Sequence, residues 1–160
     1  MLVALVEPEI PPNTGNIARL CAAFDVELHL IEPLGFKLEN RYLKRAGLDY
    51  WPHVKLSVWP NFRAFLNRPK RPGDERLVMT SAKRAGCAPL QDFAFTRHDA
   101  IVLGAETRGL PEDIFALSPH RLRIPIRNMS AGGVRSLNLS TACGIILFQG
   151  LAACKLLPDS

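Results

Sequence analysis

The chain has 160 residues, of which 48% are hydrophobic and 22% are charged, enough apolar material for one core of ordinary domain size. A single domain over residues 1–160 is therefore expected. Lysine and arginine number 20 against 15 for aspartate and glutamate, so the net charge is +5. This excess makes an acidic partner such as nucleic acid plausible without establishing one.

The cysteines and the apolar segments argue against several classes of protein. The four cysteines are far apart and form no C-x-x-C pair: Cys21, Cys87, Cys143 and Cys154. This spacing argues against a structural zinc site and for a reducing compartment. The apolar run Leu2–Val6 lacks a basic leader, and the apolar stretch from Thr141 to Leu157 is interrupted by Gln149 and Lys155. We therefore expect a cytoplasmic protein with neither a signal peptide nor a membrane span.

Short apolar runs alternate with helical patterns along the chain, which is typical of an α/β fold with a mainly parallel sheet flanked by helices. Strands are expected at Leu2–Val6, Val26–Ile31, Val54–Val58, Arg76–Thr80, Ala100–Gly104 and Leu122–Ile126. Helices are expected from near Thr14, with Asn13 or Thr14 as the cap, over Glu39–Ala46, over Asn61–Asn67, and from Asn138–Ser140 to before Pro158.

The loop after the first predicted strand is rich in proline and amide residues. It runs from Glu7 to Asn16 and brings Asn13, Asn16 and then Arg19 to the start of a helix. Ligands of open parallel sheets bind beyond the carboxyl ends of the strands, so these side chains are candidates for a site. The same residues can also have purely structural roles, because Asn13 can cap the helix and Arg19 can be a solvated charge on its surface.

The loop after the fifth predicted strand reads Gly104-Ala-Glu-Thr-Arg-Gly-Leu-Pro111. It has the glycine spacing of a phosphate loop, but Leu110 and Pro111 stand where that motif requires Lys and Ser or Thr. A nucleoside triphosphate site is therefore excluded. A structural turn accounts for the glycines but not for Glu106 and Arg108 between them.

Two further segments carry polar side chains. The sequence Arg135-Ser-Leu-Asn-Leu-Ser140 precedes the last helix, where Ser136 and Asn138 suit either capping or a site. Basic and aromatic residues mingle between Phe36 and Lys55: Lys37, Arg41, Tyr42, Lys44, Arg45, Tyr50 and Trp51. Such a mixture is typical of surfaces that bind unpaired RNA. It is equally typical of a helix with a solvent-exposed basic face and buried aromatic rings on the other side.

Together these segments resemble the three motifs of the SPOUT RNA 2′-O-methyltransferases. The matching segments are Asn13-x-x-Asn16-x-x-Arg19, Leu103-Gly-Ala-Glu-Thr-Arg-Gly-Leu-Pro111, Ile124-Pro-Ile and Arg135-Ser-Leu-Asn-Leu-Ser140. The opening from Glu7 to Cys21 and the segment from Lys44 to Trp51 are similar to the members that methylate the wobble pyrimidine of tRNA. The resemblance covers essentially the whole chain.

The resemblance implies a deep C-terminal trefoil knot that clasps S-adenosylmethionine, and a tRNA anticodon loop as substrate. It implies cofactor-binding roles for Met79, Thr80, Gly104, Ile124, Ser136 and Leu137. It implies catalytic roles for Arg19, Asn13, Glu106, Ser136 and Asn138, and we assign RNA-binding roles to Arg41, Lys44, Arg45 and Arg108. Family members are proposed to use Arg19 as the base, but an arginine keeps its proton above about pH 12. We therefore expect Arg19 to bind the RNA phosphate and stabilise developing negative charge, with the proton acceptor unassigned.

The last predicted helix indicates a twofold dimer, which the resemblance also implies. Its apolar residues surround too much of the helix for one core: Ala142, Ile145, Ile146, Leu147, Phe148, Leu151, Ala152 and Leu156. In such a dimer Arg19 acts either within its own chain or across the interface. Two other functions stay open, which are 2′-O-methylation of another RNA such as ribosomal RNA, and RNA binding without catalysis.

Overall fold

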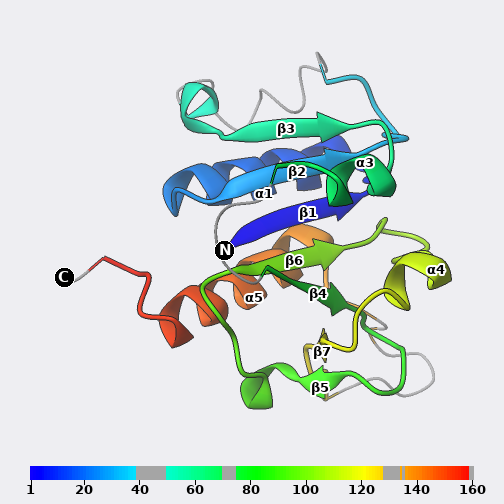
Figure 1. The fold of residues 1–160 in the computed structure, drawn as a ribbon, viewed down its shortest axis with the longest axis vertical. Helices are drawn as coiled ribbons and strands as arrows, with labels where there is room; N and C mark the ends of the chain where they lie inside the picture. Colours follow the sequence, from blue (N-terminus) through cyan, green and yellow to red (C-terminus); the bar gives the residue numbers. More distant parts are fainter. Residues whose placement is uncertain (39–49, 70–74, 128–133, 135, 159–160) are drawn as a thin grey trace.

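The computed structural model describes residues 1–38, 50–69, 75–127, 134 and 136–158. These residues form a seven-stranded sheet in which every pairing is parallel, in the order β3-β2-β1-β6-β4-β7-β5 (Figure 1). The strands are β1 Leu2–Val6, β2 Glu27–Ile31, β3 Leu56–Trp59, β4 Arg76–Thr80, β5 Ala88–Pro89, β6 Asp99–Leu103 and β7 Arg121–Arg123. The α-helices are α1 Pro11–Ala23, α3 Phe62–Leu66, α4 Glu112–Phe115 and α5 Leu139–Ala153, with 3-10 turns η1 Trp51–His53 and η2 Leu90–Asp92.

The predicted α/β fold with a mainly parallel sheet is confirmed, and each predicted strand lies within two or three residues of its expected bounds. The largest difference is β7, which ends at Arg123 rather than Ile126. Pro125 has no N–H to donate to the sheet, so the ladder stops before it. The two-residue strand β5 was not predicted because it is too short to show a periodicity.

The order of the strands reverses beside β1. The chain adds β2 and then β3 on one side of β1, and it builds β6, β4, β7 and β5 on the other (Figure 1). β1 and β6 are paired from Leu2 with Ala100 to Leu5 with Leu103, so the loops that leave them emerge side by side. This is the switch point where open parallel sheets bind their ligands.

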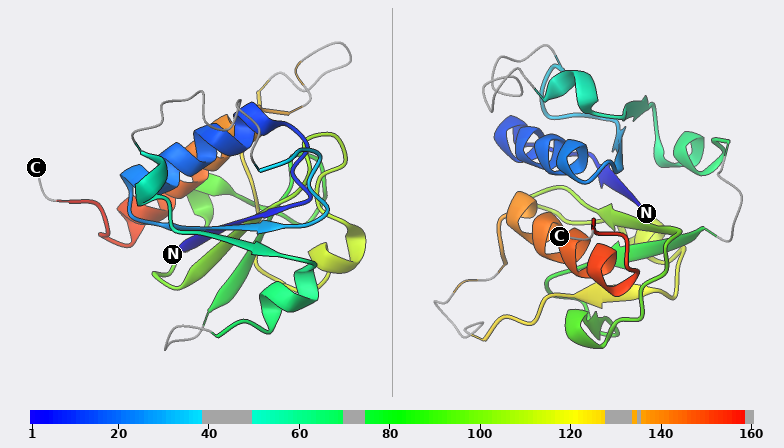
Figure 2. Two further views of the ribbon diagram at one scale, coloured as in Figure 1. Left: turned by 90° about the horizontal axis from the view of Figure 1, so that it is seen from above. Right: turned by 90° about the vertical axis from the view of Figure 1, so that its left-hand side faces the viewer.

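Helices cover both faces of the sheet, with α1 and α5 on one face and α3 and α4 on the other (Figure 2). All five residues of β1 are buried because each face of this strand lies under a helical layer. Val3 and Leu5 pack with α1 and α5, whereas Ala4 and Val6 pack with the Phe62 side of the sheet. Such two-sided burial explains why the central strands are continuous apolar runs.

Helix α1 starts earlier than predicted and without the predicted cap. It begins at Pro11 after the N-cap residue Ile10, whose side chain makes no capping hydrogen bond. Prolines fit the first turn of a helix and have no N–H, so Pro11 and Pro12 leave fewer donors to satisfy. The prediction of Asn13 or Thr14 as the cap is therefore wrong, and the Asn13 side chain is available for another partner.

The other helix predictions have mixed outcomes. Helix α5 begins directly after Asn138, whose Oδ1 accepts hydrogen bonds from the backbone N–H groups of Ser140 and Thr141, as predicted. Helix α3 follows Asn61, whose Oδ1 caps the Ala64 N–H at 2.9 Å. The predicted helix over Glu39–Ala46 lies outside the described residues.

Among the residues described, no helix combines the length and the apolar character needed to cross a membrane.

A buried histidine of β2, His29, contacts both the edge strand β3 and helix α3. His29 accepts a 2.9 Å hydrogen bond at Nδ1 from the Trp59 indole, and its Nε2 lies 3.4 Å from Glu27 Oε2. Its ring also packs edge-on against Phe65. Burial lowers the pKa of His29, and the positive charge of Arg68 lowers it further. The folded protein therefore favours the neutral ring, which keeps Nδ1 free to accept from Trp59.

Because the folded state depresses this pKa, His29 should make stability depend on pH. The unfolded histidine takes up a proton below about pH 6.5 and the folded one does not, so the free energy of unfolding should decrease as pH falls below 6.5. One proton gives a slope of at most about 1.4 kcal/mol per pH unit. Urea unfolding of His29→Gln between pH 5 and 8 should lack this component. The exposed His98→Gln variant should keep it, and the same pH dependence in both variants would show that His29 does not cause it.

Candidate active site

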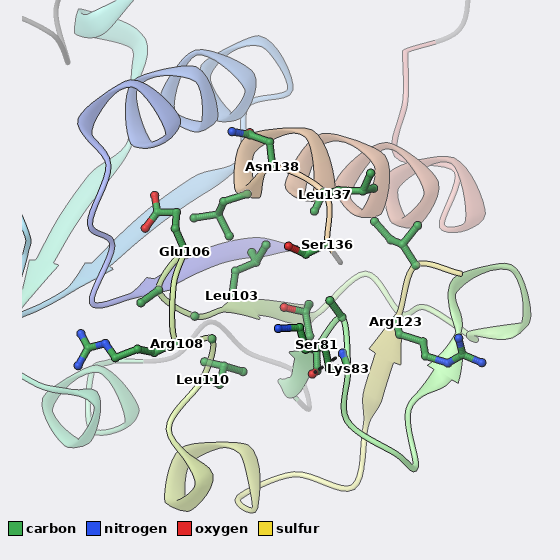
Figure 3. Close-up of a pocket in the computed structure, with 18 of the residues that line it drawn as sticks. Ser81, Lys83, Leu103, Glu106, Arg108, Leu110, Arg123, Ser136, Leu137 and Asn138 are labelled. Carbon is green, nitrogen blue, oxygen red and sulfur yellow. Dashed lines mark hydrogen bonds between the residues drawn. The ribbon is translucent and has the colours of Figure 1, made fainter. Parts of the chain in front are cut away.

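A cavity of about 530 Å³ opens at the carboxyl ends of β4, β6 and β7, beside the start of α1 (Figure 3). Its walls come from four segments that are far apart in sequence: the start of α1, the loop after β4, the loop after β6, and the segments before α5. Figure 3 shows Glu106 and Asn138 on one side of this cavity and Ser81, Lys83 and Leu110 on the other. The position is the one that the strand reversal predicts.

The loop after β6 is closed by its own backbone. Gly109 donates its N–H to the Ala105 carbonyl at 2.8 Å, and its φ of 71° lies in the region that favours glycine. A Cβ on Gly104 would lie 2.1 Å from backbone atoms of Gly109 and Leu110, which leaves no space for a side chain. The glycines thus explain the turn, and the turn aims Glu106 at the start of α1.

The Glu106 carboxylate binds the N-terminal end of α1. Oε2 accepts from the Glu9 N–H at 2.7 Å, and Oε1 accepts from the Ile10 N–H at 3.2 Å and from Asn13 Nδ2 at 3.0 Å. The carboxylate takes the place of a cap, and its charge is favourable at a helix N-terminus. The sequence placed Glu106 and Asn13 in one site, but it did not show this contact.

Asn13 and Asn138 continue the network to α5. Asn13 Oδ1 accepts from Asn138 Nδ2 at 2.8 Å, and Asn138 Oδ1 accepts from Ser140 Oγ at 2.7 Å. We call Glu106, Asn13 and Asn138 the amide–carboxylate network. It joins residues 93 and 125 positions apart in the chain. Three of the five predicted catalytic residues therefore meet at one edge of the cavity.

A second set of contacts also joins the loop after β1 to the loop after β6. The Glu9 carboxylate accepts from the N–H of Thr107 at 3.0 Å and from its hydroxyl at 2.8 Å. These hydrogen bonds lower the pKa of Glu9, so it is ionised at neutral pH. Arg108, a predicted RNA-binding residue, lies 3.2 Å from Glu7 Oε2 and 3.5 Å from Glu9 Oε1. Its side chain stays 65% exposed at the rim of the cavity.

Most of the predicted cofactor-binding residues line the cavity, namely Thr80, Gly104, Ile124, Ser136 and Leu137. Met79 does not. Its side chain is fully buried in the other core layer with Phe62 and Phe65, and only Thr80, the next residue of β4, reaches the cavity. Successive residues of a strand face opposite sides, so both cannot point into one pocket.

Arg19 does not line the cavity. It lies on the exposed face of α1, and its guanidinium sits 5.7 Å from the centre of the Tyr50 ring. The structure therefore does not bring Arg19 together with Glu106, Asn13 and Asn138 within one chain. The other predicted RNA-binding residues, Arg41, Lys44 and Arg45, lie outside the described residues.

The sequence predictions missed the loop after β4. Ser81, Lys83 and Arg84 form a wall of the cavity, although none was proposed as a site residue. The available signal was their position beyond the carboxyl end of a predicted strand, since the same rule identified the other loops. Among the described residues, no cluster of histidine, cysteine, aspartate or glutamate could hold a metal ion. All four cysteines are free.

Comparisons with known proteins identify the fold as that of the SpoU-type RNA methyltransferases. A solved structure described as "Structural insights into the 2-OH methylation of C/U34 on tRNA" superposes with a TM-score of 0.83. It is 44% identical in sequence, and the match covers 94% of this chain and 93% of that chain. The profile of the SpoU rRNA Methylase family matches residues 1–148. The chain belongs to this family.

Two curated relatives are similar over most of their length. The tRNA (cytidine(34)-2′-O)-methyltransferase of Burkholderia ambifaria is 43% identical over 149 residues, which cover 92% of this chain and 91% of the relative. The enzyme of the same name from Aeromonas hydrophila is also 43% identical, over 151 residues that cover 92% of this chain and 90% of the relative.

The amide–carboxylate network should stabilise the fold through Glu106. Replacing Glu106 by Gln leaves one of its three donors without an acceptor, so we expect unfolding to become easier by about 1–3 kcal/mol. Chemical denaturation at pH 7 measures this, with Glu32→Gln, an exposed carboxylate, as the control. Equal stability of the two variants would mean that the Glu106 contacts contribute nothing.

Proposed function

We propose that this chain is an S-adenosylmethionine-dependent methyltransferase that acts on the ribose 2′-hydroxyl of the wobble pyrimidine, residue 34, of tRNA. The observation that supports it most directly is near-full-length similarity to enzymes with this named activity. The amide–carboxylate network at the cavity supports it independently, because it joins the loops that carry the motifs. A cytoplasmic location belongs to the proposal because tRNA is the substrate.

The cavity residues fit the cofactor. Gly104 lines the cavity with its backbone alone, because a Cβ there would clash with the loop at Gly109 and Leu110. Leu103, Ile124 and Leu137 supply apolar surface for a flat ring. When bound, S-adenosylmethionine supplies a methyl group already activated on a sulfonium. The predicted knot involves the segment before Ser136, much of which lies outside the described residues, and it stays a prediction.

The chain must orient the ribose and help remove one proton, since a 2′-hydroxyl is a poor nucleophile. Both Glu106 oxygens already accept hydrogen bonds, so we assign Glu106 a positioning role rather than that of the base. Asn13 and Asn138 hold each other in the same way. Ser136 is exposed, and Figure 3 shows its hydroxyl directed toward the middle of the cavity. We therefore assign Ser136 a direct contact with the reacting groups.

Arg19 is assigned to the RNA and the transition state, and its position favours a site shared between two chains. It does not line the cavity of its own chain, whereas α5 exposes apolar side chains on the outside of its layer. Phe148 is 52% exposed and Ile145 is 41% exposed, and Phe148 packs beside Phe24 of α1. We propose that this surface pairs with a second copy, which would bring Arg19 of one chain to the cavity of the other.

The dimer surface is smaller than the sequence suggested. Ile146, Leu147 and Leu151 are covered by the chain's own core, so the exposed apolar face reduces chiefly to Ile145 and Phe148. A twofold axis through these residues would let each contact its counterpart. Methylation of another RNA and RNA binding without catalysis are the competing functions.

The choice among these functions rests on the substrate. Incubation with labelled S-adenosylmethionine should transfer label to total tRNA and not to ribosomal RNA. Transfer to ribosomal RNA alone would favour methylation of another RNA, and RNA binding without transfer would favour RNA binding without catalysis.

The Ser136→Ala variant should lower turnover by about 10²-fold or more if its hydroxyl contacts the reacting groups.

Arg19→Ala should abolish turnover while the cofactor still binds, because Arg19 lies outside the cavity.

The shared site is tested by mixing Arg19→Ala chains with Asn138→Ala chains and letting the dimers reassociate at random. If the site is shared between chains, the mixture should recover roughly a quarter of normal activity on simple dimer statistics. Each mixed dimer then has one intact site and one doubly damaged site. Absence of recovery would place both residues in one chain's site, and an active monomer in sedimentation would exclude the dimer requirement.

A further inference from the structure

The wall of the cavity opposite the amide–carboxylate network carries positive charge. Ser81, Lys83 and Arg84 follow β4 directly, and all three line the cavity together with Arg123 of β7. Figure 3 shows Ser81 and Lys83 across the cavity from Glu106 and Asn138. One end of the cavity thus has the Glu106 carboxylate, which already accepts hydrogen bonds from protein N–H groups, and the other end has Lys83 and Arg84.

Arg84 is held in one position by the protein. Its guanidinium lies 4.4 Å from the centre of the Phe115 ring, and Nη2 donates to the Leu110 carbonyl at 2.7 Å. Nη2 also lies 3.3 Å from Glu112 Oε2, but the Glu112 side chain is 80% exposed, so water screens this ion pair. The stacking and the carbonyl fix the guanidinium plane against the wall.

The third nitrogen of this guanidinium is unsatisfied. Among the described residues, Arg84 Nη1 is buried and has no hydrogen-bond partner. A buried charged donor without an acceptor is costly, and native proteins rarely leave one without a reason. The guanidinium of Arg123, which also lines the cavity, lies near the neighbouring Cys87 thiol, where its charge opposes the rise of the thiol's pKa caused by burial. The wall therefore has more positive charge than Glu112 offsets.

We propose that Arg84 binds the carboxylate at the amino-acid end of S-adenosylmethionine. This inference rests on the proposed function, since it concerns the same cavity. The carboxylate is the one anionic group of this cofactor, and a carboxylate is a favourable acceptor for a guanidinium. An RNA phosphate is the alternative anion, but the unsatisfied Nη1 is buried in the wall of a cavity, where a small ligand reaches more easily than a polynucleotide backbone.

The test compares two ligands that differ only in the carboxylate. Titration calorimetry should show that the unmodified protein binds S-adenosylmethionine about 10- to 100-fold more tightly than decarboxylated S-adenosylmethionine. Arg84→Gln should lose most of this preference by weakening the first ligand and leaving the second nearly unchanged. Arg121→Gln is the matched control, because Arg121 stacks on the same Phe115 ring at 4.6 Å but does not line the cavity. It should keep the full preference.

Other outcomes overturn the proposal. Equal weakening of both ligands by Arg84→Gln would assign Arg84 a purely structural role, and an unchanged preference would remove it from the carboxylate site. Loss of tRNA affinity with an unchanged cofactor preference would assign it to phosphate. If Arg84→Gln does not fold, Arg84→Lys serves instead and should show a reduced preference, since an ammonium keeps the charge without the planar fork. Failure of the unmodified protein to bind either ligand would refute the proposed function itself.

Discussion

The hydrogen bonds that Glu106 accepts from the start of α1 are the contacts on which the rest of the site depends. Two prolines open the helix and remove two backbone donors, so a single carboxylate from the β6 loop satisfies the Glu9 and Ile10 N–H groups. The Asn13 side chain, freed from capping, then joins Glu106 to Asn138. Glu106 is the residue through which this network joins Asn13 and Asn138 to the loop after β6.

The network shapes a cavity with two different ends. The end of the cavity beside the network is polar. Its hydrogen-bonding groups are already paired, because nearly every donor and acceptor of Glu106, Asn13 and Asn138 has a partner within the protein. The opposite end, at Lys83 and Arg84, retains a buried donor without a partner. A ligand with an anionic terminus therefore has a preferred direction in the cavity. Such polarity is how a small, mostly apolar pocket fixes the orientation of what it binds.

Sequence patterns predicted the strands well because central parallel strands must be apolar on both faces. They also predicted that the loops after β1 and β6 and the segment before α5 lie together, since ligands gather beyond strand ends, but they missed the loop after β4. Sequence patterns failed where the role of a side chain depends on contacts with residues far away in the sequence. Asn13 looks like a helix cap until Glu106 is placed beside it, and nothing in the sequence singled out Arg84, whose contacts with Phe115 and Leu110 only the fold provides. Strand alternation alone places the Met79 side chain away from the cavity that Thr80 lines, and a backbone contact of Met79 with the cofactor stays a prediction.

The central claim is that this cavity serves methylation of the wobble ribose, and mapping the methyl group on tRNA tests it most directly. A 2′-O-methyl group blocks alkaline cleavage of the adjacent phosphodiester bond, since cleavage requires the free hydroxyl. After incubation with S-adenosylmethionine, the account predicts one newly resistant bond, on the 3′ side of residue 34. Resistance at another nucleotide, or a methyl group on a base with every bond still cleavable, would contradict it.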